Sequence, residues 1–449
     1  MVTSPFRVLF VSGQDGGTRR YRCDQPREQL EQQGIATGFR EASDLRLVID
    51  ALDYDVFILH RVPYSHLIGH ILNWAHQRGK IAIFETDDLV FKREVVGYDG
   101  YYRNLPPVEA RHYLHKVEGH RQTLDRCDYA LTTTGYLAQA LQQHGKQVFI
   151  NRNALGSEFV RLAEEARQHP VDKADGRIVL GYISGSVSHN QDFAAITEAL
   201  LNVMSKHPQV ELLIIGLLDL DKRLEPVRSR IRTIPLIPWQ NVPRESRVID
   251  INLAPLEIDN PFCQSKSEVK YFEAGILGIP TIAARTEAFE FAIHHGETGF
   301  LAGDTREWIA ALESLIDHAG LRKTIGEAAR RDVLRNYLPD VRGKQFAQLL
   351  SDLVAQPSTR ADTVSTQEQV EYQIMSYVAG ILEELMTPYT PSDLPRPYDD
   401  TLWRRRYLFE RLEEAHEALG RTRRADGAQT GWHEASIGID RRYRKEHGT

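Results

Sequence analysis

Residues Phe262–Ala284 read FCQSKSEVKYFEAGILGIPTIAA, which predicts a short charged helix followed by a buried strand. Lys266, Lys270 and Glu273 recur at helical spacing and are therefore expected on one face of that helix. The other face carries an apolar stripe made of Val269, Phe272 and Ile276. We therefore expect one face to pack in a core and the other to present two cations and a carboxylate to a ligand.

The start of this helix has the signature of a capped N-terminus. Ser265 is followed three residues later by Glu268, a capping-box pattern that predicts a helix beginning at Ser265. The first backbone N–H groups of a helix have no partner inside it, so they attract an anion. Together with the neighbouring lysines they predict a site for a phosphate or a diphosphate.

The same stretch resembles the donor-binding segment of retaining GT-B glycosyltransferases of family four, the glycosyl transferases group 1. In that family a helix glutamate precedes a Gly-x-Pro turn and a short strand, and the matching residues are Glu273, Gly278 and Pro280. The family usually has another glutamate eight positions before the first, where this chain has Ser265. The chain thus resembles a divergent bacterial branch.

The composition is that of an ordinary globular protein. Of the 449 residues, 42% are hydrophobic and 26% are charged, and the formal net charge of -7 argues against a general nucleic-acid binder. The spacing of Cys23, Cys127 and Cys263 fits neither a disulfide framework nor a structural zinc site, which favours a reducing compartment. Without a secretion signal or a membrane-spanning apolar run, we expect a cytoplasmic protein whose membrane contact, if any, is peripheral at the inner face of the cell membrane.

Buried strands alternate with helices in the first part of the chain, a pattern typical of a doubly wound parallel sheet. Strands are expected at Arg7–Ser12, Val56–Leu59, Ile81–Phe84, Tyr129–Thr132 and Val148–Ile150. Helices are expected at Arg22–Gln33, Leu67–Gln77 and Ala110–Arg126. The polar stretch Ala163–Gly176 then interrupts the alternation and predicts a domain boundary.

After this stretch the alternation restarts. Strands are expected at Ile178–Ile183, Glu211–Ile215, Ile249–Ala254 and Thr281–Ala284, and helices at Phe193–Lys206, Thr305–His318 and Leu321–Asn336. We therefore predict an α/β chain with two Rossmann-like, doubly wound parallel-sheet domains, residues 1–170 and 171–355. The resemblance implies a GT-B arrangement in which the first domain binds the acceptor and the second binds the nucleotide-sugar donor across a cleft.

The remaining residues, 356–449, differ in character. Residues 356–368 read as a linker, and helices are expected at Val370–Leu385 and Leu402–Arg424, the latter beside a cluster of arginines. This helical extension either packs on the body of the protein or on a protein partner, or it docks on an anionic membrane surface.

The loop after the first strand contains Gly16 and Gly17. Glycines at the carboxyl end of a strand allow the backbone to approach a phosphate, although this loop lacks the Gly-x-Gly-x-x-Gly spacing of a plain dinucleotide site. By the resemblance, Gly16 and Gly17 lie against the donor diphosphate. The alternative is a turn that merely requires positive φ.

The second domain opens with a similar strand, loop and helix. Ser184, Gly185 and Ser186 offer backbone and hydroxyl donors to phosphate oxygens, and His189 follows. The resemblance implies that this loop touches the donor. Family four usually places an arginine and a lysine here, and their absence nominates Lys266 or Lys270 as the substitute. Alternatively, His189 and Asp192 only cap the following helix.

Acidic residues follow a strand of the first domain. Asp87 and Asp88 come after the expected strand Ile81–Phe84, where a carboxylate can bind a metal or remove a proton from an acceptor hydroxyl. The resemblance implies that no bound metal is needed and that Asp88 or Asp87 faces the acceptor; the alternative is an Asp that caps a turn. The remaining histidines are expected at the surface, among them His112, His115 and His120.

The resemblance implies a hexosyltransferase-like enzyme that moves a sugar, with retention, from a nucleotide-sugar donor to an acceptor hydroxyl on a glycan, a lipid-linked glycan or a protein. Glu273 would bind the donor ribose, and a bacterial surface polysaccharide or glycoconjugate is the expected product. Two alternatives stay open: a nucleotide-sugar epimerase or a phosphorylase on the same fold, and a non-catalytic scaffold subunit, which Ser265 at the expected glutamate position favours.

Overall fold

Two parallel sheets organise the protein. The computed structural model describes residues 6–356 except 45, 170, 172–175 and 186–188. The first sheet has the strand order β2-β1-β3-β4-β5-β6. Its strands are β1 (Arg7–Ser12), β2 (Ala36–Glu41), β3 (Val56–His60), β4 (Ile81–Thr86), β5 (Tyr129–Thr132) and β6 (Gln147–Ile150), all paired in parallel.

The second sheet has the order β12-β11-β10-β7-β8-β9 and is also parallel. Its strands are β7 (Ile178–Ser184), β8 (Val210–Gly216), β9 (Ile231–Ile234), β10 (Ile251–Ala254), β11 (Thr281–Ala284) and β12 (Phe300–Ala302). The prediction of two doubly wound α/β sheets is therefore confirmed. We call residues 6–168 the first half and residues 176–336 the second half.

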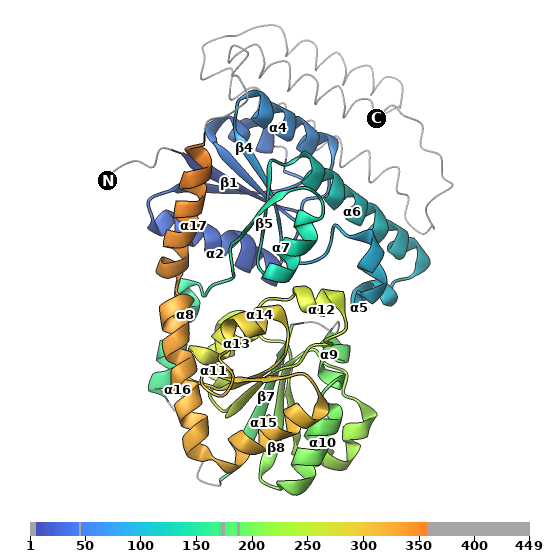
Figure 1. Cartoon of the computed structure of the whole chain (residues 1–449), viewed down its shortest axis with the longest axis vertical. Helices are drawn as coiled ribbons and strands as arrows, with labels where there is room; N and C mark the ends of the chain where they lie inside the picture. Colours follow the sequence, from blue (N-terminus) through green and yellow to red (C-terminus); the bar gives the residue numbers. More distant parts are fainter. Residues whose placement is uncertain (1–5, 45, 170, 172–175, 186–188, 357–449) are drawn as a thin grey trace, which may run out of the picture. The chain divides into compact units, whose positions relative to one another are not determined.

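Helices connect the strands in both halves (Figure 1). Those of the first half are α1 (Gly17–Arg19), α2 (Gln25–Gln32), α4 (His66–Gln77), α5 (Gly100–Arg103), α6 (Pro107–Arg126), α7 (Gly135–Gln142) and α8 (Ser157–Gln168). Those of the second half are α9 (Asn190–Ala194), α10 (Thr197–Lys206), α11 (Val242–Ser246), α12 (Pro261–Ser265), α13 (Val269–Gly275), α14 (Glu287–Ala292), α15 (Thr305–Asp317) and α16 (Ala319–Asn336). Residues 43–53, with α3 (Leu47–Asp50), fall in a separate compact unit.

The last described helix, α17 (Pro339–Val354), returns to the first half. It lies beside α2 in Figure 1, and Phe346, Leu350 and Leu353 are buried in one cluster with strand residues such as Val8. Residues late in the chain thus complete the first core. The expected boundaries at 170/171 and 355/356 remain a prediction.

Several expected helices differ in their bounds. The helix expected from Arg22 begins at Gly17 and passes through a π-helical turn, η1 (Arg20–Asp24). The expected helix Phe193–Lys206 is two helices, α9 and α10. Part of the polar stretch expected to interrupt the pattern is helical, because apolar residues of α8, including Phe159, Ala163 and Ala166, pack into a core. The expected tail helices lie outside the described residues.

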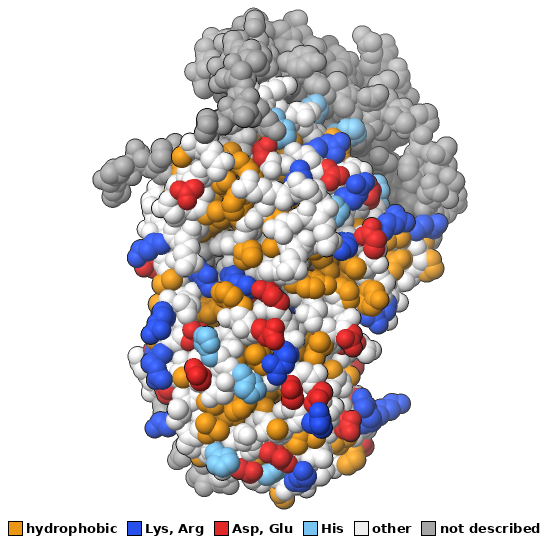
Figure 2. Space-filling model, in the orientation of Figure 1, with side chains coloured by type: hydrophobic (Ala, Val, Ile, Leu, Met, Phe, Trp, Pro, Cys, Tyr) orange, Lys and Arg blue, Asp and Glu red, His pale blue; other side chains and the backbone are white. Residues whose placement is uncertain are grey.

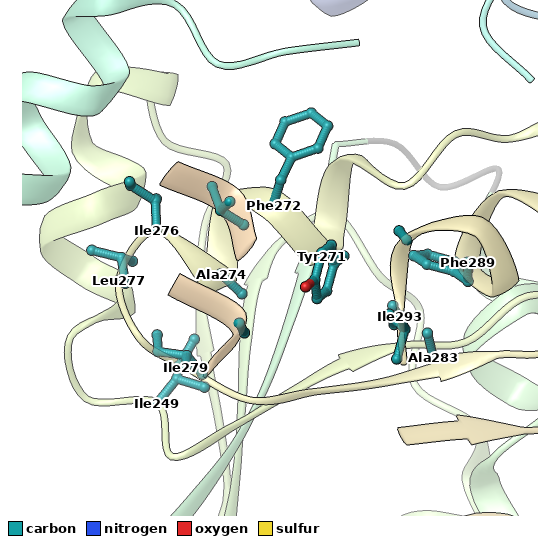
Figure 3. Packing of buried hydrophobic residues seen from close by; sticks show 14 of the residues in the cluster. Ile249, Tyr271, Phe272, Ala274, Ile276, Leu277, Ile279, Ala283, Phe289 and Ile293 are labelled. Carbon is teal, nitrogen blue, oxygen red and sulfur yellow. The ribbon is translucent and has the colours of Figure 1, made fainter. Parts of the chain in front are cut away.

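Helix α13 is anchored in the core of the second half. Tyr271, Phe272 and Ile276 are fully buried, and Figure 3 shows them among neighbours from adjoining elements, such as Phe289 and Ile293. The apolar stripe predicted through Phe272 and Ile276 is therefore confirmed. This packing holds the polar side of α13 in a fixed position.

The distribution of surface charge and the character of the helices bear on nucleic-acid and membrane binding. Figure 2 shows acidic, basic and histidine side chains interspersed over the visible face of the second half. No helix among the described residues is both long and apolar enough to span a bilayer.

Candidate functional site

The charged stretch of the second half folds as two short helices rather than one. Asn260 accepts a hydrogen bond from the Phe262 backbone at 3.0 Å and caps α12, which has Pro261 at its first position. That helix ends at Ser265, whose hydroxyl donates to the Phe262 carbonyl at 2.7 Å. The predicted capping box is therefore wrong, because Asn260 and Pro261 start the helix earlier. Glu268 precedes α13 without capping it.

Lys266 consequently does not share a helix face with Lys270 and Glu273. It follows α12 with extended backbone, at φ -69° and ψ 140°. Burial lowers the pKa of Lys266, but the charges of Asp88 and Asp192 outweigh it and hold the pKa above its ordinary value. Lys266 is therefore a permanent cation between carboxylates of the two halves.

Lys270 connects α13 to the end of β7. Its Nζ donates to the Ile183 carbonyl and lies 4.6 Å from the centre of the Tyr182 ring. Burial lowers the pKa of Lys270 to about 8, although the charges of Glu273 and Asp192 oppose the shift. This lysine is therefore still largely charged at neutral pH and loses its proton at moderately alkaline pH.

Glu273 receives two donors from the first half. The Tyr21 hydroxyl donates to Oε1 of Glu273, and Nη2 of Arg20 lies 3.3 Å from the same atom. Burial and the charge of Glu273 raise the pKa of Tyr21 well above its ordinary value, so the hydroxyl stays a donor. The predicted donor helix and the helix after the Gly-rich loop are thus in direct contact.

Both glycine-containing loops leave open space at their glycines, and Gly16 also has a positive φ. Gly16 has φ 80°, and a Cβ added at Gly16, Gly17 or Gly185 would meet no atom of the described residues within 4 Å. Gly16 thus satisfies the alternative of a positive-φ turn and also leaves space in front of α1. Ser184 ends β7 and is buried. Ser186 lies outside the described residues.

His189 and Asp192 bind each other. Nδ1 of His189 is 2.8 Å from Oδ2 of Asp192, and neither side chain caps α9, so the capping alternative is wrong. Oδ1 of Asp192 accepts from Sγ of Cys263 at 3.0 Å and from the Glu257 backbone at 3.3 Å. Burial lowers the pKa of His189 and favours the neutral ring, despite its hydrogen bond to Asp192.

Asp192, Glu257 and Cys263 have ligand atoms within 4.8 Å of one another, a spacing that could hold a metal ion. Burial and the charge of Asp192 raise the pKa of the Cys263 thiol, however, and metals bind the thiolate. Both Asp192 oxygens already accept hydrogen bonds within the protein. The donor set therefore fits a hydrogen-bonded cluster better than a metal centre.

Asp88 of the first half contacts the second half through its side chain. Its Oδ1 accepts from the Ser265 hydroxyl at 3.1 Å and from its neighbour Leu89 N at 2.9 Å, while Oδ2 lies 3.5 Å from Nη2 of Arg61. Asp87 also binds Arg61, at 2.5 Å. The adjacent aspartates therefore share one arginine, and Asp88 serves both its own turn and the contact with Ser265.

Behind Asp87 lies a buried charged network. Nε of Arg22 donates to Oε1 of Glu85 at 2.7 Å, and both side chains are fully buried. Nε2 of His60 is 3.8 Å from Oε2 of Glu85. His120, which we expected at the surface, is 4% exposed, and its ring nitrogens lie 3.3 Å from the Val90 carbonyl oxygen and 3.0 Å from that of Arg61.

A match to a family model covers residues 177–318, with the description glycosyl transferases group 1. The second half of the chain is therefore similar to this family over those residues. Glu273, Gly278 and Pro280, which carry the predicted resemblance, lie within the matched residues. No curated protein sequence matches the chain.

Solved structures share the fold of more than three quarters of the chain. HepE of Anabaena, in complex with UDP, is 15% identical with a TM-score of 0.54, and the match covers 77% of this chain and 100% of HepE. Sucrose-phosphate synthase of Thermosynechococcus elongatus is 16% identical with a TM-score of 0.54, covering 78% and 100%. The catalytic domain of Arabidopsis thaliana starch synthase IV, bound to ADP and acarbose, is 10% identical with a TM-score of 0.57, covering 79% and 100%. The protein therefore has the GT-B fold.

Sequence reasoning missed part of the site around helix α13. Arg20 and Tyr21 were not among the expected site residues, and Cys263 was considered only as a disulfide or zinc candidate. The run Arg19–Arg22, RRYR, was the available signal, because several cations beside a glycine loop are unusual for a plain turn.

Proposed function

We propose that the protein transfers a sugar, with retention, from a nucleotide-sugar donor to an acceptor hydroxyl. The observation that carries the proposal is the convergence on Glu273. Lys270 and Glu273 project from α13, and Arg20 of the first-half helix that follows Gly16 and Gly17 reaches the same carboxylate. Cations, a carboxylate and an open glycine backbone at strand ends suit a nucleoside diphosphate.

Each group has a role in this scheme. Glu273 binds the donor ribose, as the family resemblance implies. Lys266, Lys270 and the backbone of Gly16 and Gly17 stabilise the diphosphate, and the loop Ser184–Ser186 and His189 complete its surroundings. Negative charge grows on the diphosphate as the glycosidic bond breaks, so donors fixed in advance lower the barrier there most.

Asp88 is the proposed acceptor-side carboxylate. Ser265 and Arg61 fix its orientation, which suits a group that must take a proton from an acceptor hydroxyl. We propose that the reaction needs no bound metal, since Lys266 and Lys270 supply the positive charge. Activity that survives EDTA would support this view, whereas restoration by an added divalent ion would overturn it.

The biological setting is proposed on the same basis. We propose synthesis of a bacterial surface polysaccharide or glycoconjugate, with a glycan, a lipid-linked glycan or a protein as acceptor. Cys23, Cys127 and Cys263 are free, buried thiols, which supports a reducing, cytoplasmic location. Contact of the C-terminal extension with a membrane or a protein partner stays a prediction.

A thermal-shift panel tests the donor site. UDP, GDP, TDP, CDP and ADP are added to the wild type and to Glu273→Ala, since a ligand at 100 times its Kd adds about 2.7 kcal/mol of stability. UDP is the first probe because the HepE structure contains it. A shift with one diphosphate that shrinks in Glu273→Ala supports the site and identifies the base.

The other classes give different results. No shift with any diphosphate would favour the non-catalytic scaffold. Conversion of a nucleotide sugar without any acceptor would indicate an epimerase, and dependence on inorganic phosphate a phosphorylase. Transfer of labelled sugar to an acceptor, with the anomeric configuration read by NMR, tests both transfer and retention.

A further inference from the structure

Arg20 occupies an unusual position for a residue of the first half. It lies one helical turn after Gly17 and reaches the second half, where Nη2 is 3.3 Å from Oε1 of Glu273. Its guanidinium carbon lies 4.4 Å from the centre of the Tyr21 ring and 4.5 Å from that of Trp239. The guanidinium is therefore held by aromatic rings from both halves.

The guanidinium also has unused hydrogen-bonding capacity. Its side chain is 16% exposed, and Nη1 is buried without a hydrogen-bond partner among the described residues. A buried donor without a partner is costly, and a ligand oxygen would remove that cost. The fork of N–H groups on arginine matches the oxygens of a phosphate.

The partners of Glu273 change if its carboxylate turns towards a ligand. One of its oxygens, Oε1, accepts from both Tyr21 and Arg20. If Glu273 turns its carboxylate towards the ribose hydroxyls, the charge of Arg20 loses its closest counter-charge. A diphosphate beside the same helix would replace that charge.

We propose that Arg20 binds the diphosphate of the donor, exchanging Glu273 for phosphate oxygens when the nucleotide enters. This inference rests on the proposed function and assigns to the first half a cation of the donor site. Arginine stays charged at every physiological pH. Burial lowers the pKa of Lys270, in contrast, to about 8, so Lys270 loses its charge at alkaline pH whereas Arg20 keeps it.

The test compares a nucleoside diphosphate with its nucleoside. Kd values for UDP and uridine are measured on the full chain for wild type, Arg20→Gln and Arg19→Gln, or for ADP and adenosine if the thermal panel selects adenine. We expect Arg20→Gln to weaken UDP binding about tenfold or more and to leave uridine binding within about twofold. Arg19→Gln removes the same charge one residue earlier, where Arg19 lies over Phe39 and pairs with Asp15, and should change neither value.

The other outcomes overturn the inference or its basis. Equal weakening of UDP and uridine would mean that Arg20 only positions Glu273, and an unchanged UDP affinity would remove Arg20 from the site; both would leave the proposed function standing. Failure of the wild type to bind any nucleoside diphosphate would overturn the proposed function itself. If Arg20→Gln does not fold, Arg20→Lys, which keeps the charge but not the fork, should still weaken UDP binding selectively.

Discussion

The hydroxyl of Ser265 lies 3.1 Å from Oδ1 of Asp88 and shares its one hydrogen between this oxygen and the Phe262 carbonyl. Ser265 stands where the resembling family usually has a glutamate, and Asp88 comes from the first half. The carboxylate near this position is therefore supplied by another part of the chain. The departure from the family pattern at Ser265 thus has a structural counterpart, which weakens the argument for a non-catalytic scaffold.

Restoring the family's glutamate should harm the protein. Ser265 is fully buried, so Ser265→Glu places a second carboxylate against Asp88 and overfills the space. We expect the free energy of unfolding to fall by at least about 3 kcal/mol. Urea denaturation measures this loss, and the control Ser265→Ala should cost only about 1 kcal/mol. A Ser265→Glu protein of wild-type stability and higher activity would contradict the placement of Asp88.

Diphosphate binding should weaken as the pH rises. Burial lowers the pKa of Lys270 to about 8, so this lysine loses its proton and its attraction for phosphate above that pH. We expect the Kd of the diphosphate to rise by up to about tenfold per pH unit between about 8 and 10. The rise should be lost in Lys270→Gln and kept in Lys266→Gln, because the pKa of Lys266 is raised. Calorimetric titration over this range would reveal an unchanged Kd if Lys270 were remote from the ligand.

The same pKa predicts how stability depends on pH. Lys270 binds a proton more tightly in the unfolded chain, where its pKa is 10.5, than in the folded protein, where it is about 8. The unfolded state therefore binds more protons between these values, and Lys270 makes stability increase with pH in that window. Urea midpoints of the wild type relative to Lys270→Met should rise from pH 8 to pH 10. A constant difference would show that the lysine is not desolvated.

Removing one partner of the buried Arg22–Glu85 pair should lower the free energy of unfolding more than replacing both partners with apolar residues. Arg22→Met leaves the buried Glu85 carboxyl without its partner, and we expect a loss of about 3–5 kcal/mol. The double variant Arg22→Met/Glu85→Leu removes both charges and should lose clearly less than the single variant. Chemical denaturation of four proteins, the wild type, Arg22→Met, Glu85→Leu and the double variant, gives the coupling energy. Additive losses would mean that the two side chains do not interact.

Glu287 should protect the start of α7. One of its oxygens, Oε2, accepts from Gly135 N at 2.9 Å and Tyr136 N at 3.4 Å, while the other binds Arg152 at 2.9 Å. We expect Glu287→Ala to lower stability by about 1–2 kcal/mol and to speed hydrogen exchange at these amides. Asp304→Ala removes a comparable cap from α15 and should leave α7 exchange unchanged. Unchanged exchange in Glu287→Ala would show that the contact is not maintained in solution.

The strands that the sequence did not reveal lie at the edges of the sheets. β2 and β9 each border a sheet, as does β12, and their side chains are less consistently buried than those of the inner strands. An edge strand faces fewer neighbours, so it needs no continuous apolar run. The inner strands Arg7–Ser12, Tyr129–Thr132 and Thr281–Ala284 match the predicted bounds because burial on both faces leaves a strong signal.

The site was predictable only where it is local. Lys270 and Glu273 belong to one helix, and helical spacing placed them together. The contact of Arg20 with Glu273 joins residues 253 positions apart, which no periodic pattern can indicate. The wrong start of the helix at Ser265 has a local cause, since Asn260 and Pro261 form a stronger start signal than the Ser265–Glu268 pattern.

The return of α17 to the first half has a consequence for biosynthesis. A ribosome that has released all strands of the first sheet has not yet made Phe346, Leu350 and Leu353, which belong to the same core. One apolar face of the first sheet therefore stays incompletely covered until the second sheet and α17 have been translated. Such a nascent chain is exposed to aggregation. A chain that ends shortly before Pro339 would lack α17 and would leave the core of the first half incomplete.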